Sequence, residues 1–70
     1  VLIFQATPLH RALQEVAARF GIDVVIRDSA VVRRSVTAWF EDEPVVDVVT
    51  TICQAVGARC TVGKVIEVEP

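Results

Sequence analysis

The chain has 70 residues, 53% of them hydrophobic, and a formal net charge of −2 at pH 7. A chain of this length can form one small domain with a limited core, and this composition excludes an intrinsically disordered segment. No apolar run approaches the roughly 18 residues of a transmembrane helix, so we expect no membrane insertion by this chain. Because residue 1 is Val and not Met, we expect residues 1–70 to be a single domain cut from a longer polypeptide.

The first predicted elements are a strand at residues 1–5 and a helix at residues 8–20. Pro8 suits the first helical position, Thr7 is placed to cap the free N–H groups, and Gly21 can adopt the left-handed conformation that ends a helix. Apolar residues recur with the helical period and form one stripe, which consists of Leu9, Ala12, Leu13, Val16, Ala17 and Phe20.

A second strand is predicted at residues 22–27, followed by a loop at residues 28–34. Strand alternation puts Ile22, Val24 and Ile26 on one face, which we expect to meet the helix stripe. A third strand is predicted at residues 35–41. By the same alternation, one face of this strand points to the core and carries Val36, Ala38 and Phe40, while Trp39 points away from the helices.

The second helix is predicted at residues 44–56, with Asp42 or Glu43 as its cap. Seven of the eight residues from 45 to 52 are β-branched, so local propensity favours a strand here. We nevertheless expect a helix because the apolar stripe of the first helix recurs. Residues 58–62 and 65–69 are predicted strands joined by a hairpin at Gly63-Lys64, in which Gly63 would supply a positive φ.

An internal repeat of 36 residues organises these elements. The apolar stripe of the second helix repeats that of the first, and three identities fall on aligned positions: Phe4 and Phe40, Pro8 and Pro44, Gly21 and Gly57. The predicted order is therefore β, α, β, β, α, β, β. The fold class is α+β, with two β-α-β units plus a final strand.

The residues capable of catalysis or metal binding do not form a recognisable motif. His10 is the single histidine and has no second ligand at metal-binding spacing. Capping and solubility explain the acidic group of Glu41, Asp42, Glu43 and Asp47 better than acid/base chemistry. Arg33-Arg34 is one short basic pair in a chain of pI about 5.2, which argues against nucleic acid. We expect no catalytic residue, metal, cofactor, small-molecule substrate or nucleic-acid partner.

Charge is distributed unevenly. Residues 1–35 carry five Arg and three acids, whereas residues 36–70 carry two basic residues and six acids. Either this asymmetry orients the domain toward a partner, or both halves are ordinary solvated surfaces.

Cys53 and Cys60 lie seven residues apart, which matches neither a Cys-x-x-Cys redox motif nor a zinc site. Both positions can face the core, so two alternatives remain open: a disulfide or two buried free thiols. A disulfide would stabilise the domain by about 2 to 3 kcal/mol.

Two large apolar residues, Ile3 and Trp39, are predicted to lie off the core face, and the 36-residue repeat aligns one with the other. They form either a second core layer or an exposed patch for a partner. Our hypothesis is a partner surface made by Ile3, Trp39 and Phe40, in which Trp39 and Phe40 anchor the third strand against a neighbouring chain or domain.

The spacing of these residues resembles the short domain near the N-terminus of secretins and TonB-dependent receptors, and the similar module that closes FecR-type regulators. The resemblance rests on apolar spacing with Pro and Gly punctuation, from Phe4 and Pro8-Leu9 through Pro44-Val45 and Gly57 to the closing Gly-Lys-Val-Ile-Glu-Val-Glu-Pro. The usual receptor pattern has a Gly just before the second helix, where this chain has Phe40-Glu41-Asp42-Glu43. This departure favours the regulator or secretin type.

The resemblance implies two helices between a two-stranded and a three-stranded sheet, and a location in the periplasm. It also implies a non-catalytic module that binds a protein partner of the cell envelope, in signalling or in secretion. The alternative function is a purely structural domain that packs against its own chain.

Overall fold

The computed structural model describes residues 1–69 and contains seven elements in the predicted order. The elements are β1 (Leu2–Pro8), α1 (Leu9–Phe20), β2 (Asp23–Ile26), β3 (Ser35–Phe40), α2 (Val45–Val56), β4 (Arg59–Val62) and β5 (Val65–Glu69). The prediction that residues 45–52 form a helix despite their strand propensity is confirmed. The repeated stripe therefore outweighed local preference, because burying that stripe stabilises the helix through tertiary packing.

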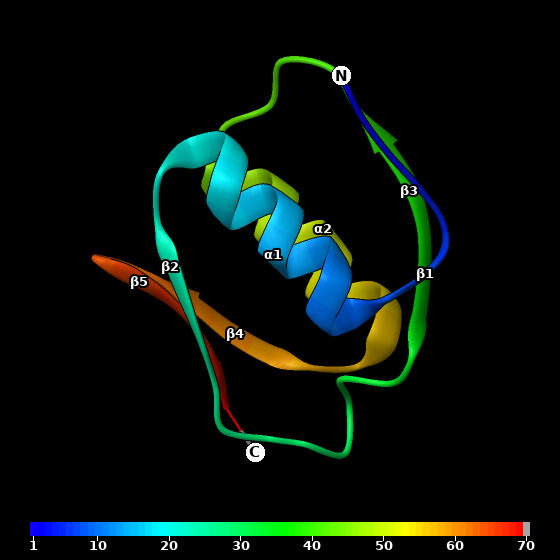
Figure 1. Ribbon diagram of the computed structural model, residues 1–70, viewed down its shortest axis with the longest axis vertical. Helices are drawn as coiled ribbons and strands as arrows, with labels where there is room; N and C mark the ends of the chain where they lie inside the picture. Colours follow the sequence, from blue (N-terminus) through cyan, green and yellow to red (C-terminus); the bar gives the residue numbers. More distant parts are fainter. Residues whose placement is uncertain (70) are drawn as a thin grey trace.

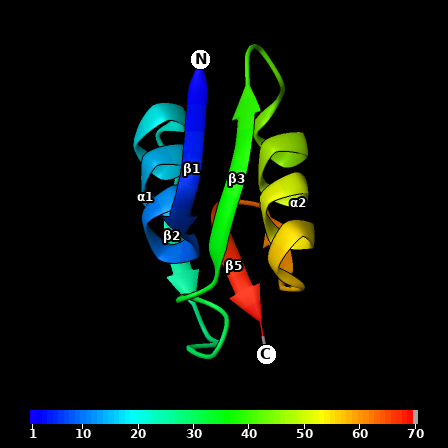
Figure 2. The same ribbon diagram turned by 90° about the vertical axis from the view of Figure 1, so that its right-hand side faces the viewer.

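The strands form two sheets, and the two helices lie between them (Figure 1). One sheet contains β1 and β3, paired antiparallel, and the other contains three strands in the order β2, β5, β4. In Figure 2, α1 and α2 stand side by side behind the β1 and β3 sheet. The predicted α+β class, with helices between a two-stranded and a three-stranded sheet, is confirmed.

The 36-residue repeat is visible as an approximate two-fold symmetry of the fold. Adding 36 to the bounds of α1 gives those of α2, and adding 36 to the bounds of β2 gives those of β4. In the small sheet Ile3 pairs with Trp39, and the flanking pairs Leu2–Phe40 and Ala38–Phe4 are repeat equivalents of each other. The approximate axis therefore passes through the Ile3–Trp39 pair.

Strand β5 has no counterpart in the repeat and fills the centre of the larger sheet. It pairs parallel with β2 and antiparallel with β4, so the two repeats contribute one strand to each of its sides. Its residues Ile66 and Val68 are fully buried. β5 thus closes the second sheet over the helices.

The core lies between the sheets and is built from the predicted stripes of both helices. Its buried members are Leu2, Phe4, Leu9, Ala12, Leu13, Val16, Val31, Val36, Phe40, Val48, Val49, Ile52, Cys53, Val56, Ile66 and Val68. Among the predicted core positions, Ala17, Ile22, Val24, Ala38 and Val45 are partly buried, and two are exposed: Phe20 at 39% and Ile26 at 38%. Both end their elements, and Ile26 belongs to an edge strand with a neighbour on one side alone.

The start of α1 is stabilised by a loop and not by the predicted Thr7 cap. Thr7 belongs to β1, where it pairs with Val36, and its hydroxyl bonds the Gln5 backbone instead. The N–H of Leu9 donates to the Arg34 carbonyl at 2.9 Å, and the N–H of His10 donates to the Val32 carbonyl at 3.3 Å. Loop 28–34 therefore satisfies the helix N–H groups that a side-chain cap would otherwise bond.

The predicted cap of α2 is also wrong, because no side chain bonds the first N–H groups of this helix. The Glu43 carboxylate accepts a hydrogen bond from the Glu41 N–H at 2.7 Å and so stabilises the preceding loop. At the other end, the Arg34 guanidinium donates to the Val56 carbonyl. A cation at a helix C-terminus bonds a free carbonyl and interacts favourably with the helix dipole.

Three glycines were assigned turn roles, and two of them have the expected backbone. Gly21 and Gly57 end their helices in the left-handed region, at φ 67° and 71°. Gly63 lies in the predicted hairpin between β4 and β5 but lacks a positive φ, which corrects that expectation. Its N–H donates to the Val65 carbonyl at 3.0 Å, which closes the turn.

Candidate interaction surface

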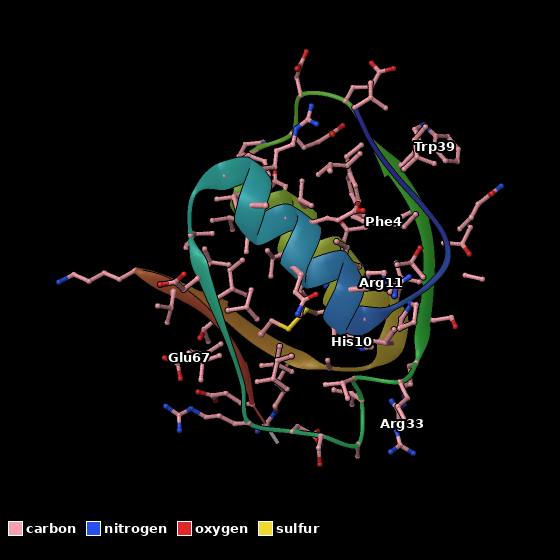
Figure 3. The ribbon with its side chains drawn as sticks, in the orientation of Figure 1. Phe4, His10, Arg11, Arg33, Trp39 and Glu67 are labelled. Atoms are coloured by element: carbon pink, nitrogen blue, oxygen red, sulfur yellow. A yellow bond between two sulfur atoms is a disulfide. The ribbon has the colours of Figure 1, made fainter. Side chains whose placement is uncertain are left out.

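Ile3 and Trp39 lie side by side on the outer face of the β1 and β3 sheet. They are cross-strand neighbours, and their exposed fractions are 66% and 74%. In Figure 3 Trp39 lies on the side of the sheet away from the helices, whereas Phe4 points inward. The alternative of a second core layer does not hold within residues 1–69, because nothing in this part of the chain covers the pair.

Phe40 belongs to the core and not to this surface. Its exposed fraction is 6%, and its ring contacts Phe4 edge-on with centroids 6.4 Å apart. The expectation that Phe40 anchors a partner is wrong, because strand alternation turns consecutive residues to opposite faces. Because Trp39 and Phe40 are consecutive in the strand, Trp39 faces outward where Phe40 faces inward.

Val1 was not singled out from the sequence but also exposes apolar surface, at 65%. It is two residues before Ile3, and period-two alternation would have placed it on the same side. We define the outer patch as Val1, Ile3 and Trp39. Three exposed apolar residues in a domain with a small core form a candidate contact surface.

The ends of β3 carry opposite charges. Arg33 and Arg34 precede the strand, and the exposed acids Glu41, Asp42 and Glu43 follow it. Strands β1 and β3 themselves contain no charged side chain. Both arginines are exposed, but only Arg34 donates a hydrogen bond to the Val56 carbonyl at the end of α2. Within residues 1–69 the one ion pair is that between Arg27 and Glu67, in the other sheet.

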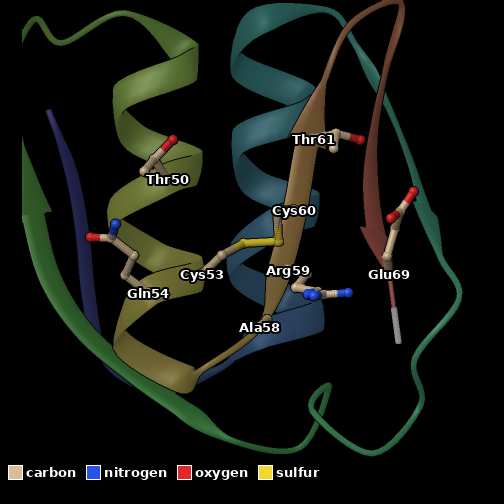
Figure 4. A pocket seen from close by; sticks show the side chains of 8 residues that line it. All are labelled: Thr50, Cys53, Gln54, Ala58, Arg59, Cys60, Thr61 and Glu69. Carbon is tan, nitrogen blue, oxygen red and sulfur yellow. A yellow bond between two sulfur atoms is a disulfide. The ribbon is translucent and has the colours of Figure 1, made fainter.

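The two cysteines lie away from the β1 and β3 sheet, where they help to line a pocket of about 410 Å³. The structure joins Cys53 in α2 to Cys60 in β4 by a disulfide. The pocket was not expected from the sequence, and Figure 4 shows its lining: Thr50, Cys53, Gln54, Ala58, Arg59, Cys60, Thr61 and Glu69. Arg59 and Glu69 face each other across the β4 and β5 ladder.

The remaining candidates provide no second site. His10 is exposed, and its Nδ1 lies 3.2 Å from the Val32 carbonyl oxygen, so it belongs to the loop contact that starts α1. In the described part of the chain, no three His, Cys, Asp or Glu side chains are grouped to hold a metal ion. Neither of its two helices has the length and continuous apolar sequence that crossing a membrane requires.

Comparison with known proteins gives one assignment. No curated protein and no solved structure matches the chain at a significant level. A family model does match, over residues 1–68, and its description is FecR, C-terminal. This match covers both repeats and β5, and it selects the regulator type among the three kinds of protein that the sequence resembles. The chain belongs to the FecR C-terminal family.

Proposed function

We propose that residues 1–70 form a single periplasmic domain of an envelope signalling regulator, and that this domain acts by binding a protein and not by catalysis. The observation that carries the proposal is the outer patch, in which Ile3 and Trp39 pair directly on a sheet face outside the core. Family membership supports the signalling role. The disulfide suits an oxidising compartment such as the periplasm.

The geometry favours the patch as the binding site for two reasons. Trp is enriched at the centres of protein interfaces because it contributes a large contact area at low entropic cost. The backbone beneath Trp39 is also fixed, since Phe40 on the opposite face is held in the core against Phe4. A partner therefore meets an aromatic residue whose backbone position is set before binding.

The competing function is a structural domain that packs the same patch against the rest of its own polypeptide. In that case removing Trp39 would change the stability of the full-length protein and would leave binding of a separate protein unaffected. The two readings therefore predict opposite results for one substitution.

The test uses Trp39→Ala and, as a matched control, Val46→Ala, which truncates a 51% exposed apolar residue on α2. The probe is the periplasmic N-terminal domain of a TonB-dependent receptor from the same organism, titrated calorimetrically. We expect Trp39→Ala to raise the Kd at least tenfold, an effect of roughly 1.4 kcal/mol or more, with a nearly unchanged Tm. Val46→Ala should bind as the wild type does. An unchanged Kd for Trp39→Ala, or a large loss of stability of the full-length protein, would favour the structural domain.

A further inference from the structure

Four strand edges are free in the described structure, and β3 offers the longest regular one. β2 and β4 have four residues each, whereas β3 has six and contains no proline. β1 is interrupted: its register shifts between Phe4 and Thr7, Ala6 has a φ of 47°, and Pro8 has no N–H to donate. An added strand would therefore find a continuous set of hydrogen-bonding groups on β3.

The outer edge of β3 is unpaired within residues 1–69. β3 pairs with β1 alone, and its alternate N–H and C=O groups point away from that partner. Figure 2 shows no strand beside β3 on the side away from β1, and α2 belongs to the layer behind. An exposed edge of this kind is a template for pairing with an extended segment.

The charges at the two ends of β3 indicate which charges a segment that pairs with this edge would carry. Arg33 stands two residues before β3, and Glu41 and Asp42 follow its last residue. The nine residues from Arg33 to Glu41 would span about 26 Å if they were fully extended, at about 3.3 Å for each of the eight steps. A complementary strand carries a basic group at the end near Glu41 and an acidic group at the end near Arg33.

We infer that β3 accepts an extended segment of the protein partner as an antiparallel strand, with basic residues at the N-terminal end of that segment and acidic residues at its C-terminal end. The orientation follows from the pairing: an antiparallel strand begins beside the end of β3, where the acids lie. Antiparallel pairing is also slightly more stable per residue than parallel pairing. Side chains on the outer face of the segment would extend the patch beside Trp39. This inference rests on the proposed function and names the chemistry of its partner.

The test uses two blocked peptides of identical composition and net charge. The basic-first probe is Lys-Lys-Val-Thr-Val-Thr-Val-Glu-Glu, and the acidic-first probe is Glu-Glu-Val-Thr-Val-Thr-Val-Lys-Lys. We expect the chain to bind the basic-first peptide at least tenfold more tightly, measured by fluorescence anisotropy. The preference should shrink between 50 and 500 mM salt because the charges are exposed.

A charge change at both ends of β3 should abolish most of the preference. Arg33→Glu combined with Glu41→Lys reverses one charge at each end and leaves the net charge unchanged, while Asp42 and Glu43 keep the second end acidic. We expect this variant to bind the two peptides with nearly equal affinity, and an undiminished preference for the basic-first peptide would overturn the inference. The matched control, Arg19→Glu combined with Glu15→Lys, makes the same exchange on the exposed face of α1 and should keep the original preference. Thermal melts of both variants report whether each is folded.

The outcomes separate this inference from the proposed function. Equal binding of the two peptides, tighter binding of the acidic-first peptide by the wild type, or self-association of the chain through β3 would overturn the inference. The titration of Trp39→Ala with the receptor domain would still stand as the test of function. A Trp39→Ala variant that binds the receptor domain normally would overturn the function whatever the peptides show.

Discussion

The helices α1 and α2 occupy equivalent places in the two repeats but are built from different residues. α1 contains one β-branched residue, Val16, whereas eight of the 12 residues of α2 are β-branched. β-Branched residues lose side-chain freedom in a helix, so α2 is the weaker helix former by roughly 3 kcal/mol in summed propensity. Equivalent backbone structure therefore does not mean equivalent local stability.

Two tertiary links are specific to the second repeat. The disulfide joins α2 to β4 at Cys53 and Cys60, where the first repeat has Ala17 and Val24. The Arg34 guanidinium bonds the end of α2 at Val56, and the equivalent end of α1 has no such side chain among the described hydrogen bonds. The comparison indicates that cross-links between elements offset poor helix propensity in the second repeat.

The largest expected effect comes from making the second repeat resemble the first. The double variant Cys53→Ala with Cys60→Val places the first repeat's residues at both positions. Removing a cross-link that closes a loop of this size should lower the free energy of unfolding by about 2.5 kcal/mol, because the unfolded chain gains freedom. Urea denaturation without reductant measures this change.

Reductant provides the control for that experiment. It should destabilise the wild type by a similar amount and leave the double variant unchanged. Alkylation of the native protein after unfolding without reductant gives an independent check by intact mass. Two alkylated cysteines would contradict the disulfide and with it this part of the comparison.

A smaller effect is expected at the Arg34 contact. Arg34→Met removes the hydrogen bond to the Val56 carbonyl and the favourable charge at the end of α2, but keeps much of the aliphatic side chain. We expect a loss of about 1.5 kcal/mol in the free energy of unfolding. Arg33→Met is the neighbouring control and should have almost no effect, because among the described residues the Arg33 side chain makes neither this hydrogen bond nor an ion pair. Equal effects at the two positions would show that Arg34 has no special role at this helix end.

The smallest effect tests helix propensity itself. Thr51→Ala replaces an exposed β-branched residue of α2 and should stabilise the protein by about 0.5 kcal/mol. The reverse change in α1, Ala18→Thr, should destabilise it by about the same amount. Chemical denaturation of both variants measures the pair. If neither variant differs from the wild type, propensity does not explain the contrast between the helices.

The candidate surface could be predicted only in part. Alternation along the first and third strands placed Ile3 and Trp39 off the core, and the structure exposes both. The same alternation assigned Phe40 to the core face, and its 6% exposure shows that the partner role proposed for it was inconsistent with that assignment. Val1 was overlooked, although the same rule applied to it. The direct Ile3–Trp39 pairing required the strand register, which the repeat alone does not give.

The helix caps show why local signals failed at other positions. Thr7 and Glu43 have the residue types that cap helices, and each bonds a nearby backbone group of its own strand or loop instead. The carbonyls that accept hydrogen bonds from the first N–H groups of α1 belong to residues 32 and 34, more than 20 positions after the start of the helix. A rule that searches the residues next to a helix cannot find such partners.

The sequence by itself determined the number, type and order of the elements. Apolar periodicity and the Pro and Gly positions are local signals, and they occur in both repeats. The sequence also determined that α2 is a helix, because the repeated apolar stripe indicated a helix where local propensity favoured a strand. Tertiary structure alone decided the placement of β5 between β2 and β4, the Ile3–Trp39 register and the partners of the helix ends. Each of these depends on which distant backbone groups come within hydrogen-bonding distance, and that depends on how the two stripes pack together.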